Sequence, residues 1–338
     1  MNRLSYIACS TIACLTAALV FAPPAPASVS PSHYSAASYL VKINDRTVLE
    51  KNPDRRLAPA SLTKIMTALL IMEKSRMDEV VTVSKGAARE TGSRIGLRRG
   101  ERLKVRDLLA ATLIASANDA CRALADHAGG SQGGFVEKMN AKAKELGLAN
   151  TRFANACGHD DASLYTTAHD LAVLAEHALD LPLFEELVSR KSMRISTVNG
   201  RRSFQLRNKN RLIGRYPGAY GVKTGTTPRA GQCLVALAKR DDRKVLLVLM
   251  RSQNRWKTAP AMLDAAFRVS TSAMRSREVK GGNDEALPQG ALVRDQEAAW
   301  SGEHNGGRGE SAVGKRHPRR SAPVQRHAHH RKRVHKRR

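Results

Sequence analysis

The order of strand-like and helical segments constrains the fold of this chain most. Strand-like segments lie at both ends of its apolar part, and a long helical region separates them. Residues 36–43 (AASYLVKI) and 47–50 (TVLE) flank Asn44-Asp45-Arg46, which is a hairpin signal. Residues 231–238 and 244–250 return to strand character, and the second contains a continuous apolar run. Strands, then helices, then strands predict an α+β fold: a sheet with helices packed on it and a helical insertion.

The middle of the chain has the residue spacing of helices. Residues 62–72 (LTKIMTALLIM) are apolar on most sides, which predicts a buried helix rather than a surface one. Further helical periodicity covers residues 105–128, 135–146 and 168–179, and residues 260–269 are predicted to form a closing helix. After about residue 276 the apolar pattern stops. We therefore expect a folded body over residues 28–275 and a disordered basic tail over residues 276–338.

Positive charge is concentrated at the C-terminal end. The chain has 57 Lys and Arg against 30 Asp and Glu, a formal charge of +27. Residues 315–338 hold eleven Lys and Arg and neither Asp nor Glu. Such a field suggests an anionic neighbour: nucleic acid, a lipid surface or an acidic envelope polymer. The apolar share of 42% excludes a wholly disordered or collagen-like chain.

The first residues narrow the choice of anionic neighbour. Met1-Asn2-Arg3 precedes an uncharged apolar run over residues 4–22, and Ala25-Pro26-Ala27 follows as a small-x-small cleavage site. This layout predicts a signal peptide over residues 1–27 and export of the protein; a retained membrane anchor is the alternative. Because the protein is expected to be exported and its tail lacks aromatic residues for base stacking, no nucleic-acid partner is expected. An anionic envelope polymer or membrane surface remains, as does a solvated tail with no fixed partner.

Cysteine usage argues against a disulfide framework. Two of the five cysteines lie in the predicted leader, which leaves Cys121, Cys157 and Cys233. An odd number cannot all pair internally, and no two are spaced as a zinc clip. We expect core thiols, with one reactive thiol as the alternative, and neither a metal nor a cofactor.

One pair of residues at the start of the buried helix can carry chemistry. Ser61 and Lys64 are three residues apart, so their side chains share a face of the first helical turn. A serine hydroxyl needs a neighbouring base to act as a nucleophile, and a lysine amine can serve when burial and nearby cations favour its neutral form. The alternative is a capping serine followed by an exposed lysine.

Two further motifs favour the chemical interpretation. Ser116-Ala117-Asn118 follows an apolar helix over residues 108–115, where both polar side chains can point into a cleft. Lys223-Thr224-Gly225 stands just before the last strand pair. Lys223 can supply positive charge, and the small residues after it let a substrate backbone lie against a strand edge.

These three motifs, in this order, match the β-lactamase and penicillin-binding-protein superfamily. Residues 59–68, 116–120, 165–171 and 221–227 resemble the serine D-alanyl-D-alanine carboxypeptidases of the low-molecular-mass penicillin-binding proteins. The resemblance covers about residues 36–269. It implies a β-lactamase/transpeptidase-like catalytic domain over residues 28–275, in which an antiparallel sheet is packed between helices beside a helical subdomain.

The resemblance also implies a role for each motif residue. Ser61 would be the acylated nucleophile, Lys64 its general base and Ser116 a proton relay. Backbone N–H groups of Ser61 and Thr226 would form the oxyanion hole. The implied substrate-binding residues are Asn118, Lys223, Thr224, Gly225, Thr226 and Arg255. Thr226 stands where many relatives have His, which bears on fine specificity.

The implied activity is removal of the terminal D-alanine from the peptidoglycan stem pentapeptide, with β-lactams as covalent inhibitors. The implied location of the exported protein is the bacterial periplasm or cell envelope. Two alternatives stay open: an endopeptidase of the same family that cuts peptide cross-links, and a non-catalytic envelope-binding protein. A β-lactamase is disfavoured, because no Glu-x-x-Leu-Asn segment lies between Ser116 and Lys223 to activate a deacylating water.

Overall fold

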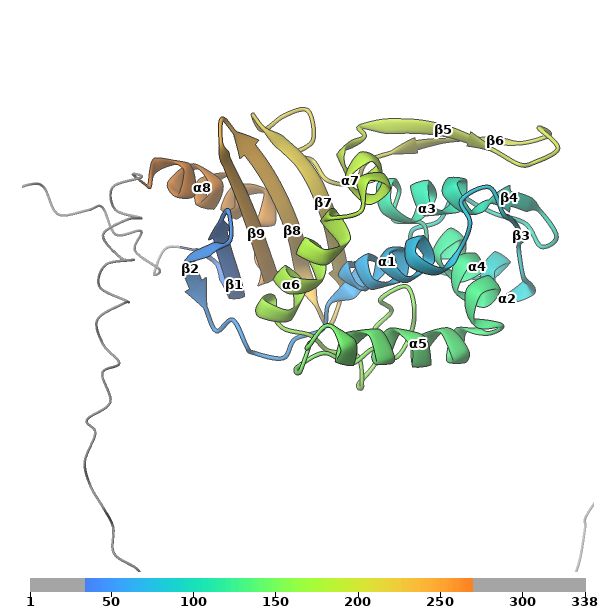
Figure 1. Ribbon diagram of the computed structural model, residues 1–338, viewed down its shortest axis with the longest axis horizontal. Helices are drawn as coiled ribbons and strands as arrows, with labels where there is room; N and C mark the ends of the chain where they lie inside the picture. The colour runs from blue at the N-terminus through green and yellow to red at the C-terminus, as the bar shows by residue number, and fades with distance from the viewer. Residues whose placement is uncertain (1–33, 270–338) are drawn as a thin grey trace, which may run out of the picture. The chain divides into compact units, whose positions relative to one another are not determined.

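The computed structural model describes residues 34–269 (Figure 1). The predicted signal peptide, residues 1–27, and the predicted tail, residues 276–338, lie outside the described residues. Within residues 34–269, no helix is long and apolar enough to cross a membrane.

A five-stranded sheet in the order β2-β1-β9-β8-β7 forms one half of the described body, and every neighbouring pair is antiparallel. The N-terminal hairpin adds to the C-terminal strands through β1, with Leu40 opposite Val248. Strand β7 is one edge of the sheet. The strands are β1 (Ala36–Ile43), β2 (Arg46–Lys51), β7 (Ala219–Thr227), β8 (Gly231–Arg240) and β9 (Arg243–Ser252). The predicted α+β class is confirmed.

Both faces of this sheet are buried, which explains the continuous apolar run in β9. Helix α8 (Arg255–Arg268) covers one face, and α1 (Lys64–Lys74) and α6 (Ala168–Leu179) lie on the other side (Figure 1). Val245, Leu247 and Leu249 belong to the core under α8, whereas Leu246, Val248 and Met250 belong to the core under the other helices. Successive side chains of a strand point to opposite faces, so a strand buried on both sides is apolar throughout.

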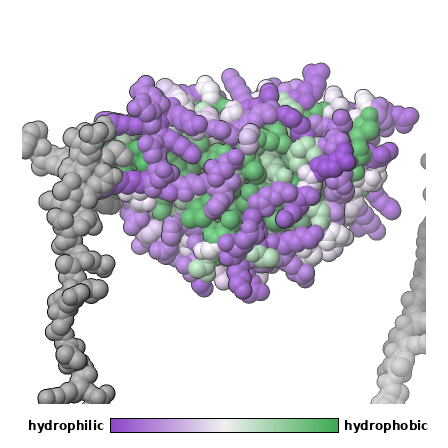
Figure 2. All heavy atoms as spheres, viewed as in Figure 1, coloured by the Kyte–Doolittle hydropathy of each residue, from purple (hydrophilic) through white to green (hydrophobic). Residues whose placement is uncertain are grey.

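The second half is helical and lies beyond the β7 edge (Figure 1). The helical half contains the 3-10 turn η2 (Ala60–Thr63) and the helices α2 (Lys85–Ala88), α3 (Val105–Ile114), α4 (Asn118–Gly129), α5 (Gln132–Glu145) and α7 (Pro182–Ser189). This half also has two small antiparallel sheets of two strands each, β3 (Val80–Thr82) with β4 (Arg102–Lys104), and β5 (Ser192–Ser196) with β6 (Ser203–Arg207). Hydrophilic residues cover most of the face in Figure 2, with apolar residues visible between them.

One predicted boundary is confirmed and another needs correction. The chain leaves α3 before Ser116, as predicted from its position after an apolar helix; Ser116 has a left-handed φ of 58°, and residues 105–128 form two helices. Helix α8 begins at Arg255 instead of residue 260, because the Asn254 side chain caps it by accepting a hydrogen bond from the Lys257 N–H. Pro260, the first residue of the predicted helix, lies inside α8.

Candidate active site

Ser61 lies in a tight turn at the N-terminal end of α1. The expected helix begins as the 3-10 turn η2 and becomes α-helical at Lys64. A 3-10 turn has three residues per turn, which aligns the side chains at positions i and i+3. The Lys64 Nζ atom is 2.9 Å from Ser61 Oγ. Lys64 is fully buried, while Ser61 is half-buried, so the hydroxyl stays within reach of solvent and ligands.

Two further oxygens surround the Lys64 amine. Nζ donates to Asn118 Oδ1 at 2.7 Å and to the backbone oxygen of Cys157 at 2.6 Å. Both oxygens can only accept hydrogen bonds. A neutral amine at this position would give its two N–H groups to these oxygens, and its lone pair would then face Ser61 Oγ. The arrangement can therefore take a proton from the serine hydroxyl.

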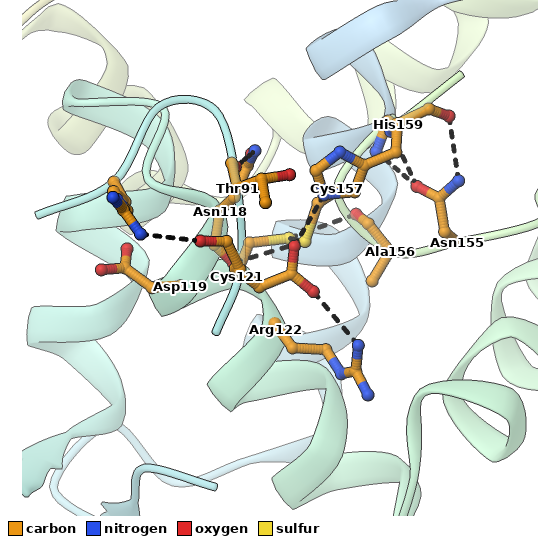
Figure 3. Close-up of polar contacts among 12 residues, drawn as sticks. Thr91, Asn118, Asp119, Cys121, Arg122, Asn155, Ala156, Cys157 and His159 are labelled. Atoms are coloured by element: carbon orange, nitrogen blue, oxygen red, sulfur yellow. Dashed lines mark hydrogen bonds and ion pairs between the residues drawn. The ribbon is translucent and has the colours of Figure 1, made fainter. Parts of the chain in front are cut away.

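The loop that carries the Cys157 oxygen is built by a local turn. Asn155 Oδ1 accepts hydrogen bonds from the N–H groups of Gly158 and His159 (Figure 3). The ring of His159 lies 2.7 Å from a carboxylate oxygen of Glu90. Burial alone would raise the pKa of Glu90, but His159 and Arg122 outweigh it and hold that pKa below its usual range. This loop was not predicted from the sequence, although Asn155-x-x-Gly158 is a recognisable turn signal.

Glycines on both sides of the Ser61 turn allow close backbone approach. A Cβ atom on Gly158, whose φ is +85°, would lie 1.9 Å from the Ala60 oxygen. On the other side, a Cβ on Gly225 of β7 would lie 2.9 Å from the Pro59 oxygen and 3.1 Å from the Ser61 nitrogen. The turn is thus held between a loop and the edge of the sheet, and neither contact has room for a side chain.

Asn118 is fixed from both of its ends. It is the first residue of α4, and its Nδ2 donates to the Thr91 oxygen at 2.6 Å. The neighbouring Asp119 is buried and accepts hydrogen bonds from the backbone N–H groups of residues 95–97. Asp119 therefore holds the loop that contains residues 91–97 against the start of α4, and this orients the Asn118 amide.

A second buried lysine approaches from β7. Lys223 Nζ lies 2.8 Å from Ser116 Oγ and 2.9 Å from the Thr224 oxygen. Burial, together with the charges of Lys64 and Arg255, holds the pKa of Lys223 well below its usual range. The left-handed backbone of Ser116 turns its hydroxyl towards this lysine at the gap between α3 and α4.

Arg255 reaches the site through the last residues of β7. One terminal nitrogen of its guanidinium contacts the oxygen of Gly225, the Thr226 hydroxyl at 2.8 Å and the oxygen of Cys233 at 3.0 Å. Burial lowers the pKa of this guanidinium. Thr226 itself is exposed. Arg255 therefore sits against the β7 end of the site, beside Gly225 and Thr226.

The nine residues singled out in the sequence thus form one connected site. Ser61, Lys64 and Asn118 make one cluster, and Ser116, Lys223 and Thr224 make a second. The Gly225 approach to Ser61 joins β7 to the first cluster. Among residues 34–269, no group of three or more His, Cys, Asp or Glu could hold a metal ion. The chemistry available to these side chains is proton removal from a serine hydroxyl beside a positively charged strand edge.

Comparison with known proteins gives consistent matches. The family model described as D-alanyl-D-alanine carboxypeptidase matches residues 25–254. The D-alanyl-D-alanine carboxypeptidase DacF of Bacillus subtilis is 40% identical over 245 residues, which are 70% of this chain and 63% of that protein. DacC of Escherichia coli is 36% identical, over 66% of this chain and 58% of its own length. The chain thus spans about three fifths of these two relatives.

Solved structures agree with the sequence matches. A mutant of the DD-transpeptidase of Streptomyces strain K15 superposes with a TM-score of 0.66 at 31% identity, covering 69% of this chain and 98% of that one. A D-alanyl-D-alanine carboxypeptidase of Mycobacterium tuberculosis gives a TM-score of 0.68 at 30% identity, over 73% of this chain and 96% of that one. The sheet and the helical half described above are therefore a known architecture.

Proposed function

The chain belongs to the D-alanyl-D-alanine carboxypeptidase family, and from this premise we propose that it is a serine D,D-carboxypeptidase that acts through an acyl-enzyme on Ser61. Its substrate would be the peptidoglycan stem pentapeptide, from which it removes the terminal D-alanine. One observation carries the proposal: Lys64 Nζ lies 2.9 Å from Ser61 Oγ, and its other two neighbours are oxygens that only accept hydrogen bonds.

The proposed acylation begins with proton transfer from Ser61 Oγ to Lys64 Nζ. The serine oxygen attacks the carbonyl carbon of the D-Ala–D-Ala bond, and the backbone N–H groups of Ser61 and Thr226 stabilise the oxyanion. Ser116 passes a proton to the leaving amine, and the contact between its hydroxyl and Lys223 supports this relay. D-Alanine leaves, and water then hydrolyses the serine ester. β-Lactams would acylate the same hydroxyl.

Substrate binding is assigned to the strand edge. We expect the stem peptide to lie along β7 as an added strand, because β7 is an edge of the sheet and Gly225 adds no side chain beside Ser61. Asn118 would hold the substrate amide. Lys223 and Thr224 would meet the terminal carboxylate, with Arg255 holding Thr226 in place.

Covalent labelling with a fluorescent penicillin tests this function. The wild-type protein should be labelled, Ser61→Ala should not, and Ser203→Ala, at an exposed serine on β6, should be labelled as the wild type. Labelling of Ser61→Ala at the wild-type rate would refute the site.

Product analysis then separates the alternatives: free D-alanine from monomeric pentapeptide supports the carboxypeptidase, whereas cleavage of cross-linked dimers alone supports the endopeptidase.

The location and the tail remain proposals from sequence. We propose export directed by residues 1–27 and binding of residues 315–338, with their eleven Lys and Arg, to an anionic surface of the envelope. A chain ending at residue 275 should lose salt-sensitive sedimentation with isolated cell walls or anionic vesicles. Equal sedimentation of the two chains at low salt would contradict the role of the tail.

A further inference from the structure

Two cysteines behind the active site approach each other unusually closely. The Cys157 Sγ atom is 2.7 Å from Cys121 Sγ (Figure 3). Non-bonded carbon atoms at optimal separation are roughly 3.5–4.0 Å apart, whereas a disulfide bond measures about 2.05 Å. Two separate thiols of ordinary size would not be expected to sit this close. Both side chains are fully enclosed, with 0% and 1% exposure.

The pair joins the two segments that surround the Lys64 amine. Cys121 lies on α4, three residues after Asn118, and Cys157 lies in the 155–159 loop, 36 residues further along the chain. Cys121 Sγ also contacts the Ala156 oxygen at 3.2 Å, and Cys157 Sγ contacts the Asn118 oxygen at 3.5 Å. Asn118 Oδ1 and the Cys157 oxygen are the two acceptors for Lys64 Nζ. A covalent link between the two sulfur atoms would fix the distance between these two acceptor oxygens.

We propose that Cys121 and Cys157 form a disulfide bond in the exported protein, and that this bond positions the two acceptor oxygens around Lys64. The positioning effect rests on the proposed function, since it concerns Lys64 as the base for Ser61. The prediction of core thiols is confirmed in the structure, where all three cysteines are buried and free; the proposed oxidation joins one pair of them and leaves Cys233 as the odd thiol.

The chemistry is a two-step exchange with a small-molecule or protein disulfide, RSSR, of the kind an oxidising compartment supplies. The thiolate of one cysteine attacks RSSR, which gives a mixed disulfide and releases one RSH. The second thiolate attacks the sulfur of the first cysteine, forms the Cys121–Cys157 bond and releases the second RSH. The two thiols lose two electrons, and RSSR gains them.

The surroundings select this pair over Cys233. Burial works against ionisation of Cys121, but its contact with Cys157 and the nearby Lys64 cation outweigh it and lower the pKa of Cys121. Burial raises the pKa of Cys157 and brings that of Cys233 to about 11. Cys233, on β8, instead contacts the oxygens of Ala58 and Ala230. Because both paired thiols are enclosed in the fold, exchange takes place while the 155–159 loop is open, either before it first closes on α4 or during a transient opening of the folded protein.

Peptide mapping tests the bond itself. The full chain is refolded with oxidised glutathione, then denatured and alkylated without reductant, digested and analysed by mass spectrometry. We expect a linked peptide pair containing Cys121 and Cys157, ~2 Da lighter than the two free peptides together, with Cys233 alkylated. The control Cys233→Ala should keep the linked pair, and Cys157→Ala should lose it. Alkylation of Cys121 and Cys157 in the wild type would overturn the proposal.

Acylation kinetics test the positioning effect. The reduced wild type and a Cys121→Ala/Cys157→Ala variant are compared with the oxidised protein at a temperature where circular dichroism shows all three folded. We expect a melting temperature roughly 5–15 °C lower without the bond. We also expect a fluorescent-penicillin acylation rate constant about tenfold lower, with an unchanged dissociation constant for the complex that precedes acylation. Reoxidation of the reduced wild type should restore the rate.

The outcomes separate this proposal from the proposed function. Absence of labelling in every redox state, with the linked peptide present, would refute the acyl-enzyme and leave the disulfide standing. Equal acylation rate constants with and without the bond would overturn the positioning role. A parallel change in the rate constant and the dissociation constant would indicate general loosening of the fold, and would also overturn that role.

Discussion

The two walls of the site each contain a buried lysine, but the lysines have different neighbours. The helical wall consists of Ser61, Lys64, Asn118 and the Cys157 loop, and its lysine has three oxygen neighbours, two of them acceptor-only. The strand wall is β7 from Lys223 to Thr226. Lys223 has two oxygen neighbours and carries a lowered pKa. The comparison suggests that burial alone does not assign a role to a lysine; the partners around its nitrogen do.

The largest expected effect falls on the helical wall. Lys64→Met should lower the acylation rate constant by about 10³-fold, because Ser61 loses its proposed base, while the dissociation constant for a carboxylate-bearing inhibitor changes little. The measurement is stopped-flow labelling with a fluorescent penicillin. Lys74→Met, at an exposed lysine on the same helix, is the control. If Lys64→Met and Lys223→Met changed the acylation rate constant and the dissociation constant equally, the two lysines would not have different roles.

On the strand wall, Lys223→Met should act mainly on binding. Loss of its charge should weaken binding of a carboxylate-bearing substrate by about 10²-fold, with Lys51→Met on the opposite edge strand β2 as the control. The lowered pKa also sets a direction with pH. Lys223 loses its proton at a pH below the usual lysine range. In that pH range, binding of the carboxylate-bearing ligand should weaken as the pH rises. In Lys223→Arg, which keeps its charge, this weakening should begin at a higher pH. Weakening at an unchanged pH would show that another group controls it.

Contact between the walls can be disturbed at Gly225. Gly225→Ala would place a methyl group 2.9 Å from the Pro59 oxygen and push β7 away from the Ser61 turn. We expect a loss of roughly 1–3 kcal/mol in the free energy of unfolding, measured by chemical denaturation, with slower acylation. In the control, Gly133→Ala on α5, the new methyl group meets nothing closer than 3.8 Å. Wild-type stability of Gly225→Ala would mean that the walls are not in tight contact.

The smallest expected effect concerns the support of the helical wall. Glu90→Gln should lower the free energy of unfolding by about 1 kcal/mol at neutral pH. The folded pKa of Glu90 lies below the usual 4.5, so its contribution is complete above that pH and is lost as the pH falls through the folded pKa. The difference from wild type should therefore shrink in acid, as followed by denaturation at several pH values. Glu137→Gln, at an exposed carboxylate on α5, should show no such trend.

Much of this architecture could be predicted from local sequence patterns. The boundaries of β1 and α6 agree with the prediction residue for residue, because each segment has a clear period and clear flanking signals. The expectation that Ser61 and Lys64 share one face is also confirmed, since three-residue spacing in a helical turn fixes it locally. The grouping of the motifs from β7 and α4 followed from the family resemblance rather than from spacing.

What the sequence did not reveal depends on contacts between distant segments. The Cys157 oxygen is a backbone atom, so no residue type marks it as a partner of Lys64. The hairpin of β5 and β6 has exposed residues at alternate positions and little apolar signal. The approach of Cys121 to Cys157 joins residues 36 positions apart through the packing of a loop on α4, which neither residue's neighbours in sequence indicate.

The two glycines that enclose the Ser61 turn have a consequence for the reaction rate. Because backbone packs against the turn from Gly158 on one side and Gly225 on the other, the backbone of Ser61, the proposed nucleophile, has little room to rearrange. Dipoles that are already oriented when a ligand arrives need no reorganisation as negative charge builds up on the carbonyl oxygen. In the proposed reaction, folding of the chain thereby lowers the activation barrier before any ligand binds, and natural variation at either glycine should be narrower than at the exposed Arg55 and Arg56.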